Sequence, residues 1–127
     1  MIIYHYSKNK IPGKLKKSFY GTNSYTKNDF NCTDIKRIFF YTEKNPEYLL
    51  SNCKYLYTVK IADHKIYDLK SDIVGYKTKY KSISEILKAI IKKGYIGIKY
   101  NIGYDIINLF QDIGYIKKEV LKWIVRQ

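Results

Sequence analysis

The sequence is short of the residues that most functional signatures require. In 127 residues it has two cysteines, two histidines, two prolines and one tryptophan. Cys32 and Cys53 have neither the spacing of zinc ligands nor that of a redox pair, so we expect reduced thiols and no metal. The few prolines and glycines form no linker, repeat or low-complexity tract. This favours a single domain that spans residues 1–127.

Long apolar runs are also absent. The N-terminal MIIYHYSKNK has too short an apolar stretch for a signal peptide. No run approaches the ~20 apolar residues that span a bilayer. We therefore expect a cytoplasmic protein with no membrane partner.

Acidic residues are few. Lys and Arg number 24 and Asp and Glu number 11, which gives a formal net charge of +13. Such a charge attracts nucleic acid, nucleotide phosphates or an acidic protein. Lys, Ile, Asn and Tyr are abundant together, as AT-rich coding produces, so a merely well-solvated chain is an equally open explanation. The charge therefore does not identify the partner.

Several catalytic and binding motifs are missing. There is no GxxxxGK[ST] phosphate loop, no GxGxxG fingerprint and no GxSxG nucleophile elbow. Two histidines, with no serine in a nucleophile context, offer little for a hydrolase triad. Tyrosines on a basic surface suit unpaired RNA bases, but the signature of the RNA-recognition motif is absent.

Apolar patterning predicts about six short strands, rich in β-branched and aromatic residues. We expect them at 2–7, 37–42, 55–61, 65–69, 95–100 and 105–110. A hairpin turn is expected at 62–64 and another turn at 101–104. The C-terminal KKEVLKWIVRQ fits either a helix or a strand.

Helices interrupt the strands. Ser82 and Glu85 form a capping box and Gly94 ends a helix whose apolar residues recur at helical spacing. A shorter helix is expected at 46–52. Residues 8–36 carry many turn signals, and a long loop-rich stretch of this kind is more often functional than a simple connection. The order of elements predicts an α+β fold.

A set of short motifs follows one another along the chain. HYS lies on the first strand and FYGTN in the loop, and RIFFYT is followed at once by a helix start. YDL, GYIGI and a strand that opens with an acidic residue come later. In order and spacing this set resembles the ADP-ribosyltransferases, specifically the small bacterial and phage-associated domains of that class. The resemblance extends from His5 to about Phe110.

The resemblance implies a fold and an activity. The fold would be ADP-ribosyltransferase-like, with two small packed antiparallel or mixed sheets and short helices. The activity would be transfer of ADP-ribose from NAD, the substrate, to a macromolecular acceptor, either protein or nucleic acid. By analogy of size, the protein would be a phage or mobile-element effector acting on host or defence machinery.

The resemblance also implies roles for individual residues. His5 would contact the hydroxyls of the nicotinamide ribose, and the aromatic strand would wall the nicotinamide pocket. Asp105 would stabilise the positive charge that develops at ribose C1′ in an oxocarbenium-like transition state. Donors for the phosphates would be Arg37 and backbone N–H groups around Gly21. The expected catalytic residues are Asp105, His5 and Tyr41. The expected NAD-binding residues are His5, Tyr6, Ser7, Tyr20, Gly21, Thr22, Asn23, Arg37, Phe40, Tyr41 and Thr42.

Each assignment has a structural alternative. Asp105 stands where the resembled family usually has glutamate, which is one methylene longer. The structural alternative for Asp105 is a turn residue that ends Gly103-Tyr104-Asp105. His5 would be a strand-edge histidine, and the aromatics of RIFFYT would be core residues. Residues 20–23 would form only a tight turn, and Asp68 and Asp72 fit solvated or capping carboxylates.

A second function remains open. A non-catalytic basic protein with the same charge would bind nucleic acid, or block a nucleic-acid-binding complex, by charge complementarity. Binding to a phosphate backbone falls steeply with ionic strength, which separates this function from NAD chemistry.

Overall fold

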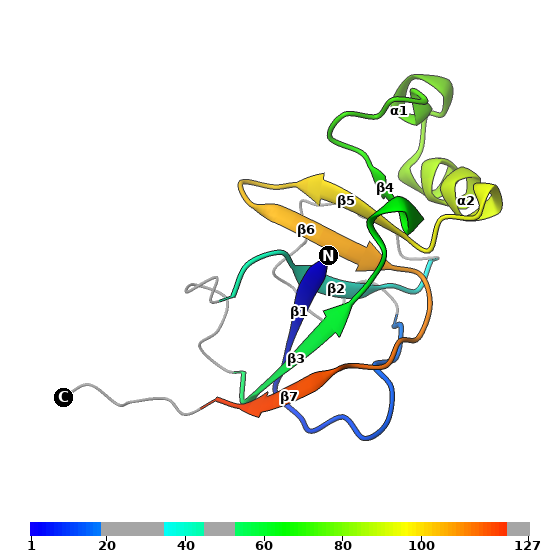
Figure 1. The fold of residues 1–127 in the computed structure, drawn as a ribbon. Coiled ribbons are helices and arrows are strands. Elements are labelled where there is room, and N and C mark those ends of the chain that lie inside the picture. The colour runs from blue at the N-terminus through cyan, green and yellow to red at the C-terminus, as the bar shows by residue number, and fades with distance from the viewer. Residues whose placement is uncertain (19–34, 45–52, 122–127) are drawn as a thin grey trace.

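The computed structural model describes residues 1–18, 35–44 and 53–121 (Figure 1). Within these residues no helix is both long enough and apolar enough to cross a membrane. The elements in chain order are β1 Ile2–Ser7, β2 Ile38–Tyr41, β3 Tyr55–Lys60, a 3-10 helix at Asp63–Lys65, β4 Ile66–Asp68, α1 Tyr76–Lys79, α2 Ile83–Lys93, β5 Gly97–Asn101, β6 Asp105–Leu109 and β7 Lys117–Val120.

The seven strands of the described residues belong to one mixed sheet, in the order β4-β5-β6-β2-β1-β3-β7. Among these strands β4 and β5 run parallel, and the other neighbours are antiparallel. The predicted α+β, ADP-ribosyltransferase-like fold with two packed sheets is therefore wrong, because the described residues form one mixed sheet with two α-helices. The pairing of Tyr4 with Tyr41 joins β1 to β2, so the strands on either side form a single sheet. Alternation along a strand shows which residues share a face but not which strand is its neighbour.

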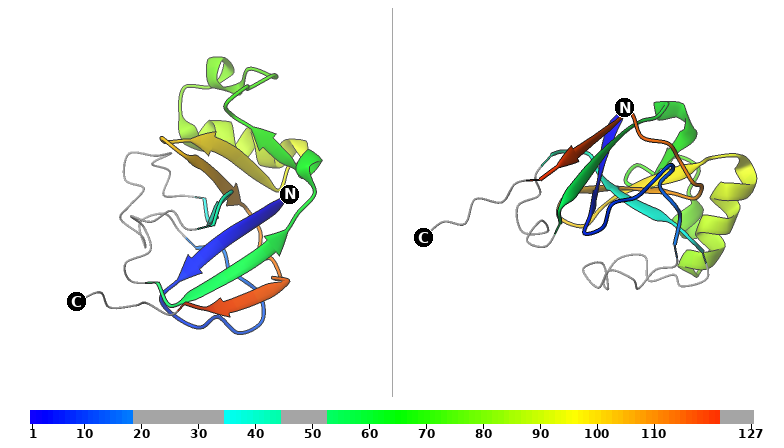
Figure 2. Two further views of the ribbon diagram at one scale, coloured as in Figure 1. Left: turned by 60° about the vertical axis from the view of Figure 1, so that its left-hand side comes forward. Right: turned by 90° about the horizontal axis from the view of Figure 1, so that it is seen from below.

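The sheet is strongly twisted, so that β1, β3 and β7 turn across the direction of β5 and β6 (Figure 2). Apolar side chains cover both of its faces. On one face α2 packs Leu87 and Ile90 against Ile98 and Ile106 of β5 and β6. The other face holds a second core, made by Ile3, Leu15, Ile38, Phe40, Tyr57, Val59, Ile61, Ile66, Ile107 and Leu109.

The hairpin expected at 62–64 is wrong. β3 pairs with β1 and β7, whereas β4 pairs with β5, and the 3-10 helix Asp63–Lys65 links these distant parts of the sheet. The carboxylate of Asp63 binds the N-terminal amine of Met1 at 2.7 Å. Two alternating strands therefore follow each other in sequence without being neighbours in the sheet.

The predicted strands and the helix at 82–94 are present with bounds that differ by at most two residues, whereas α1 Tyr76–Lys79 was not predicted. Ser82 caps α2 by accepting a hydrogen bond from the Glu85 N–H at 3.1 Å, and Gly94 ends the helix at φ +107°. β5 and β6 form an antiparallel pair around the turn after Asn101. The end of the described chain is a strand, β7. The helix expected at 46–52 lies outside the described residues.

Candidate functional site

His5 lies in the middle of β1, where this strand meets β2. Its Nδ1 lies 2.7 Å from the backbone oxygen of Phe39. Because a carbonyl oxygen only accepts, Nδ1 carries the proton in this contact. Burial lowers the pKa of His5, which outweighs the opposite effect of the Phe39 carbonyl. The imidazole is therefore held neutral, with Nε2 as a hydrogen-bond acceptor.

The aromatic residues of β2 divide between the two faces of the sheet. Phe40 is buried on the same side as His5, with 5.6 Å between ring centroids. Tyr41 lies on the other side, between Tyr6 at 5.9 Å and Tyr104 at 5.8 Å. Phe40 is fully buried, so a ligand on the His5 side of the sheet would meet His5 and not the Phe40 ring, whereas one on the opposite face would meet the half-buried Tyr41.

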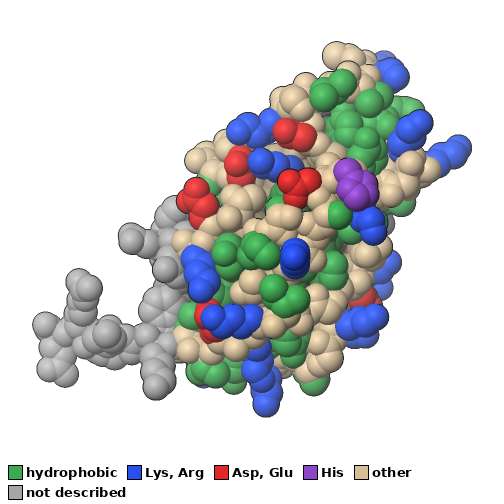
Figure 3. All heavy atoms as spheres, in the orientation of Figure 1, with side chains coloured by type: hydrophobic (Ala, Val, Ile, Leu, Met, Phe, Trp, Pro, Cys, Tyr) green, Lys and Arg blue, Asp and Glu red, His purple; other side chains and the backbone are tan. Residues whose placement is uncertain are grey.

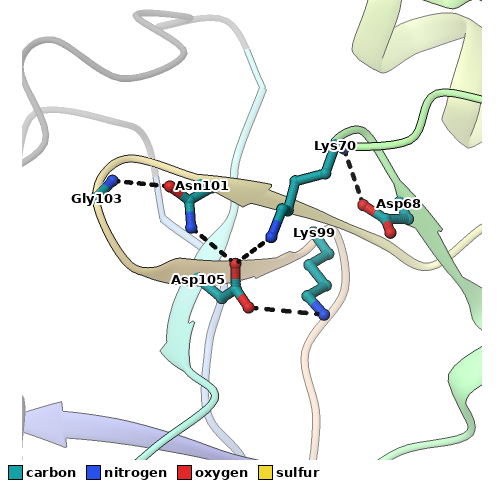
Figure 4. A network of polar contacts seen from close by, with 6 residues as sticks. All are labelled: Asp68, Lys70, Lys99, Asn101, Gly103 and Asp105. Atoms are coloured by element: carbon teal, nitrogen blue, oxygen red, sulfur yellow. Dashed lines mark hydrogen bonds and ion pairs between the residues drawn. The ribbon is translucent and has the colours of Figure 1, made fainter.

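Asp105 opens β6 and is the centre of a polar network (Figure 4). Its Oδ1 accepts a hydrogen bond from the Asn101 side chain at 2.9 Å and lies 3.5 Å from the Lys70 Nζ. Its Oδ2 lies 3.8 Å from the Lys99 Nζ. Asn101 is held in turn by the Gly103 N–H, which donates to its Oδ1 at 2.9 Å. The carboxylate is thus fixed by a hairpin side chain and flanked by two ammonium groups.

These partners keep Asp105 ionised. The hydrogen bond from Asn101 lowers its pKa most, the charges of Lys99 and Lys70 lower it further, and partial burial opposes them. The Asp105 side chain remains 28% exposed, so its ion pairs are screened by solvent and contribute little to stability.

The strand register places His5 and Asp105 on one face of the sheet but apart from each other. His5 packs on Phe40, which is opposite Ile107, and Asp105 precedes Ile107 by two residues. β2 lies between the strands that carry them. In the described part of the chain no hydrogen bond or ion pair joins the two side chains.

Arg37 is fully buried, although the sequence suggested it as a phosphate donor. It donates to the Asn108 Oδ1 at 2.7 Å, and its guanidinium lies 5.1 Å from the centre of the Phe39 ring. The hydroxyl of Tyr100 donates to the same Asn108 oxygen at 3.2 Å. This arrangement ties β2, β6 and β5 together from within the core.

The remaining expected site residues are dispersed. Tyr6 is buried, and Thr42 is half-buried just beyond β2. The Ser7 hydroxyl is engaged in a local turn, since it donates to the Asn9 carbonyl at 2.7 Å. The residues expected to bind NAD in the loop, Tyr20, Gly21, Thr22 and Asn23, lie outside the described residues.

Sequence reasoning missed the partners of the two central residues. Lys70 and Lys99 are two of 24 basic residues, and no local pattern distinguishes them. Asn101 carried a signal, because an asparagine beside a glycine-containing turn often binds neighbouring backbone groups. Among the described residues, no group of three His, Cys, Asp or Glu side chains is placed to hold a metal ion.

No family model, curated protein or solved structure matches this chain. The single sheet contradicts the ADP-ribosyltransferase-like fold, and no solved structure supports it.

Proposed function

We propose that the protein binds NAD beside His5 and transfers ADP-ribose to a macromolecular acceptor. The observation that carries the proposal is the state of the His5 ring. Its Nδ1 proton is committed to Phe39, so Nε2 is an acceptor that suits a hydroxyl donor such as a ribose. The adjacent Phe40 ring is fully buried and packs against His5, so it supports the imidazole from within the core and does not itself face a ligand.

Asp105 supplies the negative charge in this proposal. Breaking the C1′–N bond of NAD sends the bonding electrons to nicotinamide and leaves positive charge on the ribose. Because β2 lies between the strands that carry His5 and Asp105, the ribose would have to lie across β2 for the ionised carboxylate to stabilise that charge as it develops. The acceptor then forms a bond to C1′ and loses a proton. Lys70 and Lys99 would move from the carboxylate to the phosphates of NAD, which carry charge of the opposite sign to theirs.

The test is calorimetry with NAD, followed by measurement of nicotinamide release. We expect His5→Ala to weaken NAD binding by about 0.5–1.5 kcal/mol for each hydrogen bond lost. His64→Ala is the matched control, because His64 is exposed in the 3-10 helix. If the wild type has no affinity for NAD at millimolar concentration, with or without host protein and nucleic acid, the proposal fails.

One observation favours the second function, a non-catalytic protein that binds a polyanion. The positive charges of Lys70 and Lys99 already offset the negative charge of Asp105, which ADP-ribose transfer would need for the ribose. Binding of a DNA or RNA oligonucleotide that weakens steeply with salt, without nicotinamide release, would support this function instead.

A further inference from the structure

The turn between β4 and α1 exposes apolar side chains at one end of the molecule. Ile73 is 91% exposed, Val74 is 41% exposed and Tyr80, just after α1, is 36% exposed. Hydrophobic side chains gather over this end of the molecule, with basic side chains along the rim (Figure 3). We call Ile73, Val74, Tyr80 and the neighbouring Lys77, Lys79 and Lys81 the Ile73 surface.

The turn that presents Ile73 is held by an internal network. Asp72 adopts φ +44°, a left-handed conformation that few non-glycine residues take. Its carboxylate accepts hydrogen bonds from the Tyr67 hydroxyl at 2.5 Å and from the N–H groups of Tyr76 and Lys77 at 3.0 Å. The Val74 N–H donates to the Tyr67 hydroxyl at 3.0 Å. Both residues that flank Ile73 are thus fixed by buried or partly buried groups.

The rim of this surface is positively charged. Lys77, Lys79 and Lys81 are exposed, and none of them takes part in an ion pair among the described residues. The single acid between 70 and 81 is Asp72, and its oxygens are occupied within the turn. A partner that covers Ile73 would therefore gain most from acidic groups around an apolar pocket.

We propose that the Ile73 surface docks an acidic protein, with Ile73 inserted into an apolar pocket of that protein. A large aliphatic side chain at the tip of a fixed turn loses little conformational freedom when it binds. Burying it in a partner removes an apolar group from water, which is the main driving force at the centre of an interface. The lysines contribute the rate and specificity of association.

The fixed turn favours a protein over the other anionic partners. A fluid bilayer accepts an apolar tip of any conformation, so it needs no internal network to shape the tip. A nucleic acid uses the lysines but offers no aliphatic pocket. A second copy of this chain would bring another +13 charge to a basic surface. None of these conclusions depends on NAD.

The test begins with photo-crosslinking of the full-length protein in host-cell extract. A diazirine amino acid is placed at position 73 and, as the matched control, at position 116, because Ile116 is also exposed, at 65%. We expect a protein of net negative charge to be enriched in adducts at position 73. The purified partner is then titrated with wild type, Ile73→Ser and Ile116→Ser at two salt concentrations.

We expect Ile73→Ser to weaken the complex about 10- to 100-fold, as for the loss of one buried aliphatic side chain, with Ile116→Ser within about twofold of wild type. Affinity should fall as salt rises. Equal adducts at the two positions, a basic partner, or equal affinity of Ile73→Ser and wild type would overturn the proposal. So would binding that depends on Ile73 but is directed to phosphatidylserine vesicles or to a 20-nucleotide DNA.

Discussion

The Nδ1–H of His5 donates to the carbonyl oxygen of Phe39 at 2.7 Å, across the junction of β1 and β2. In this junction the side chain supplements the backbone pairing of Tyr4 with Tyr41. His5 thus has a structural role as well as the proposed role in NAD binding, and each role has its own measurement.

The structural role predicts a pH dependence of stability. Burial lowers the pKa of His5 in the folded protein, whereas the unfolded value is about 6.5. Below that pH the unfolded chain binds more protons than the folded one. Stability should therefore be fully present above about pH 6.5 and be lost as pH falls towards the folded pKa, by at most about 1.4 kcal/mol per pH unit.

Denaturant unfolding of wild type, His5→Gln and His64→Gln between about pH 7.5 and pH 5.5, one unit on either side of the unfolded pKa, measures this effect. His5→Gln should be less stable at neutral pH and should have a flatter slope. His64→Gln should keep the wild-type slope. A His5→Gln protein with an unchanged slope would show that another group accounts for the pH dependence.

Asp105 is expected to matter for chemistry more than for folding. Its ion pairs are exposed and screened, so Asp105→Asn should keep the fold and the NAD affinity. If it stabilises the oxocarbenium, turnover should fall about 10²–10³-fold, and Asp105→Glu should retain activity. Asp112→Asn is the control, because Asp112 accepts from the Lys17 N–H and has no contact with Asp105, Lys70 or Lys99 among the described residues. Full turnover of Asp105→Asn would move the search to another carboxylate.

Gly97 lies where β5 passes so close to β6 that no room is left for a side chain. A Cβ atom at this position would lie 2.3 Å from the backbone oxygen of Asn108 and 2.9 Å from the Ile66 side chain. Since backbone cannot move aside cheaply, Gly97→Ala should lower the free energy of unfolding by about 3 kcal/mol. Gly114→Ala meets no atom within 4 Å and should change it little. Thermal or urea unfolding of both variants is the measurement, and equal stabilities would contradict the packing argument.

The hydroxyl of Tyr67 is expected to hold the turn that presents Ile73. It donates to Asp72 and accepts from the Val74 N–H, and burial together with Asp72 raises its pKa to about 12. Tyr67→Phe leaves the Asp72 carboxylate without one donor and should cost about 1.5–3 kcal/mol of stability. Amide exchange at Val74 should also become faster. Tyr80→Phe, at an exposed position, is the control and should alter neither quantity.

The sequence by itself determined the local elements. The alternation of 2–7 and the capping residues of 82–94 act over a few neighbours, so β1 and α2 were predicted with nearly their observed bounds. The same reasoning placed Asp105 at the start of a strand after a turn. These features depend on backbone geometry and on which side chains share a face, and both can be read from adjacent residues.

Only the tertiary structure decided which strands are neighbours. The hairpin expected at 62–64 and the two-sheet fold were wrong because local patterns contain no information about distant pairing. That pairing brings Lys70, Lys99 and Asp105 together: β4 aligns with β5, and β5 with β6. It also buries Arg37 against Asn108, 71 residues away, although a lone arginine in sequence is usually exposed. The environment of a charged side chain depends on the strands packed around it, and these strands come from distant parts of the sequence.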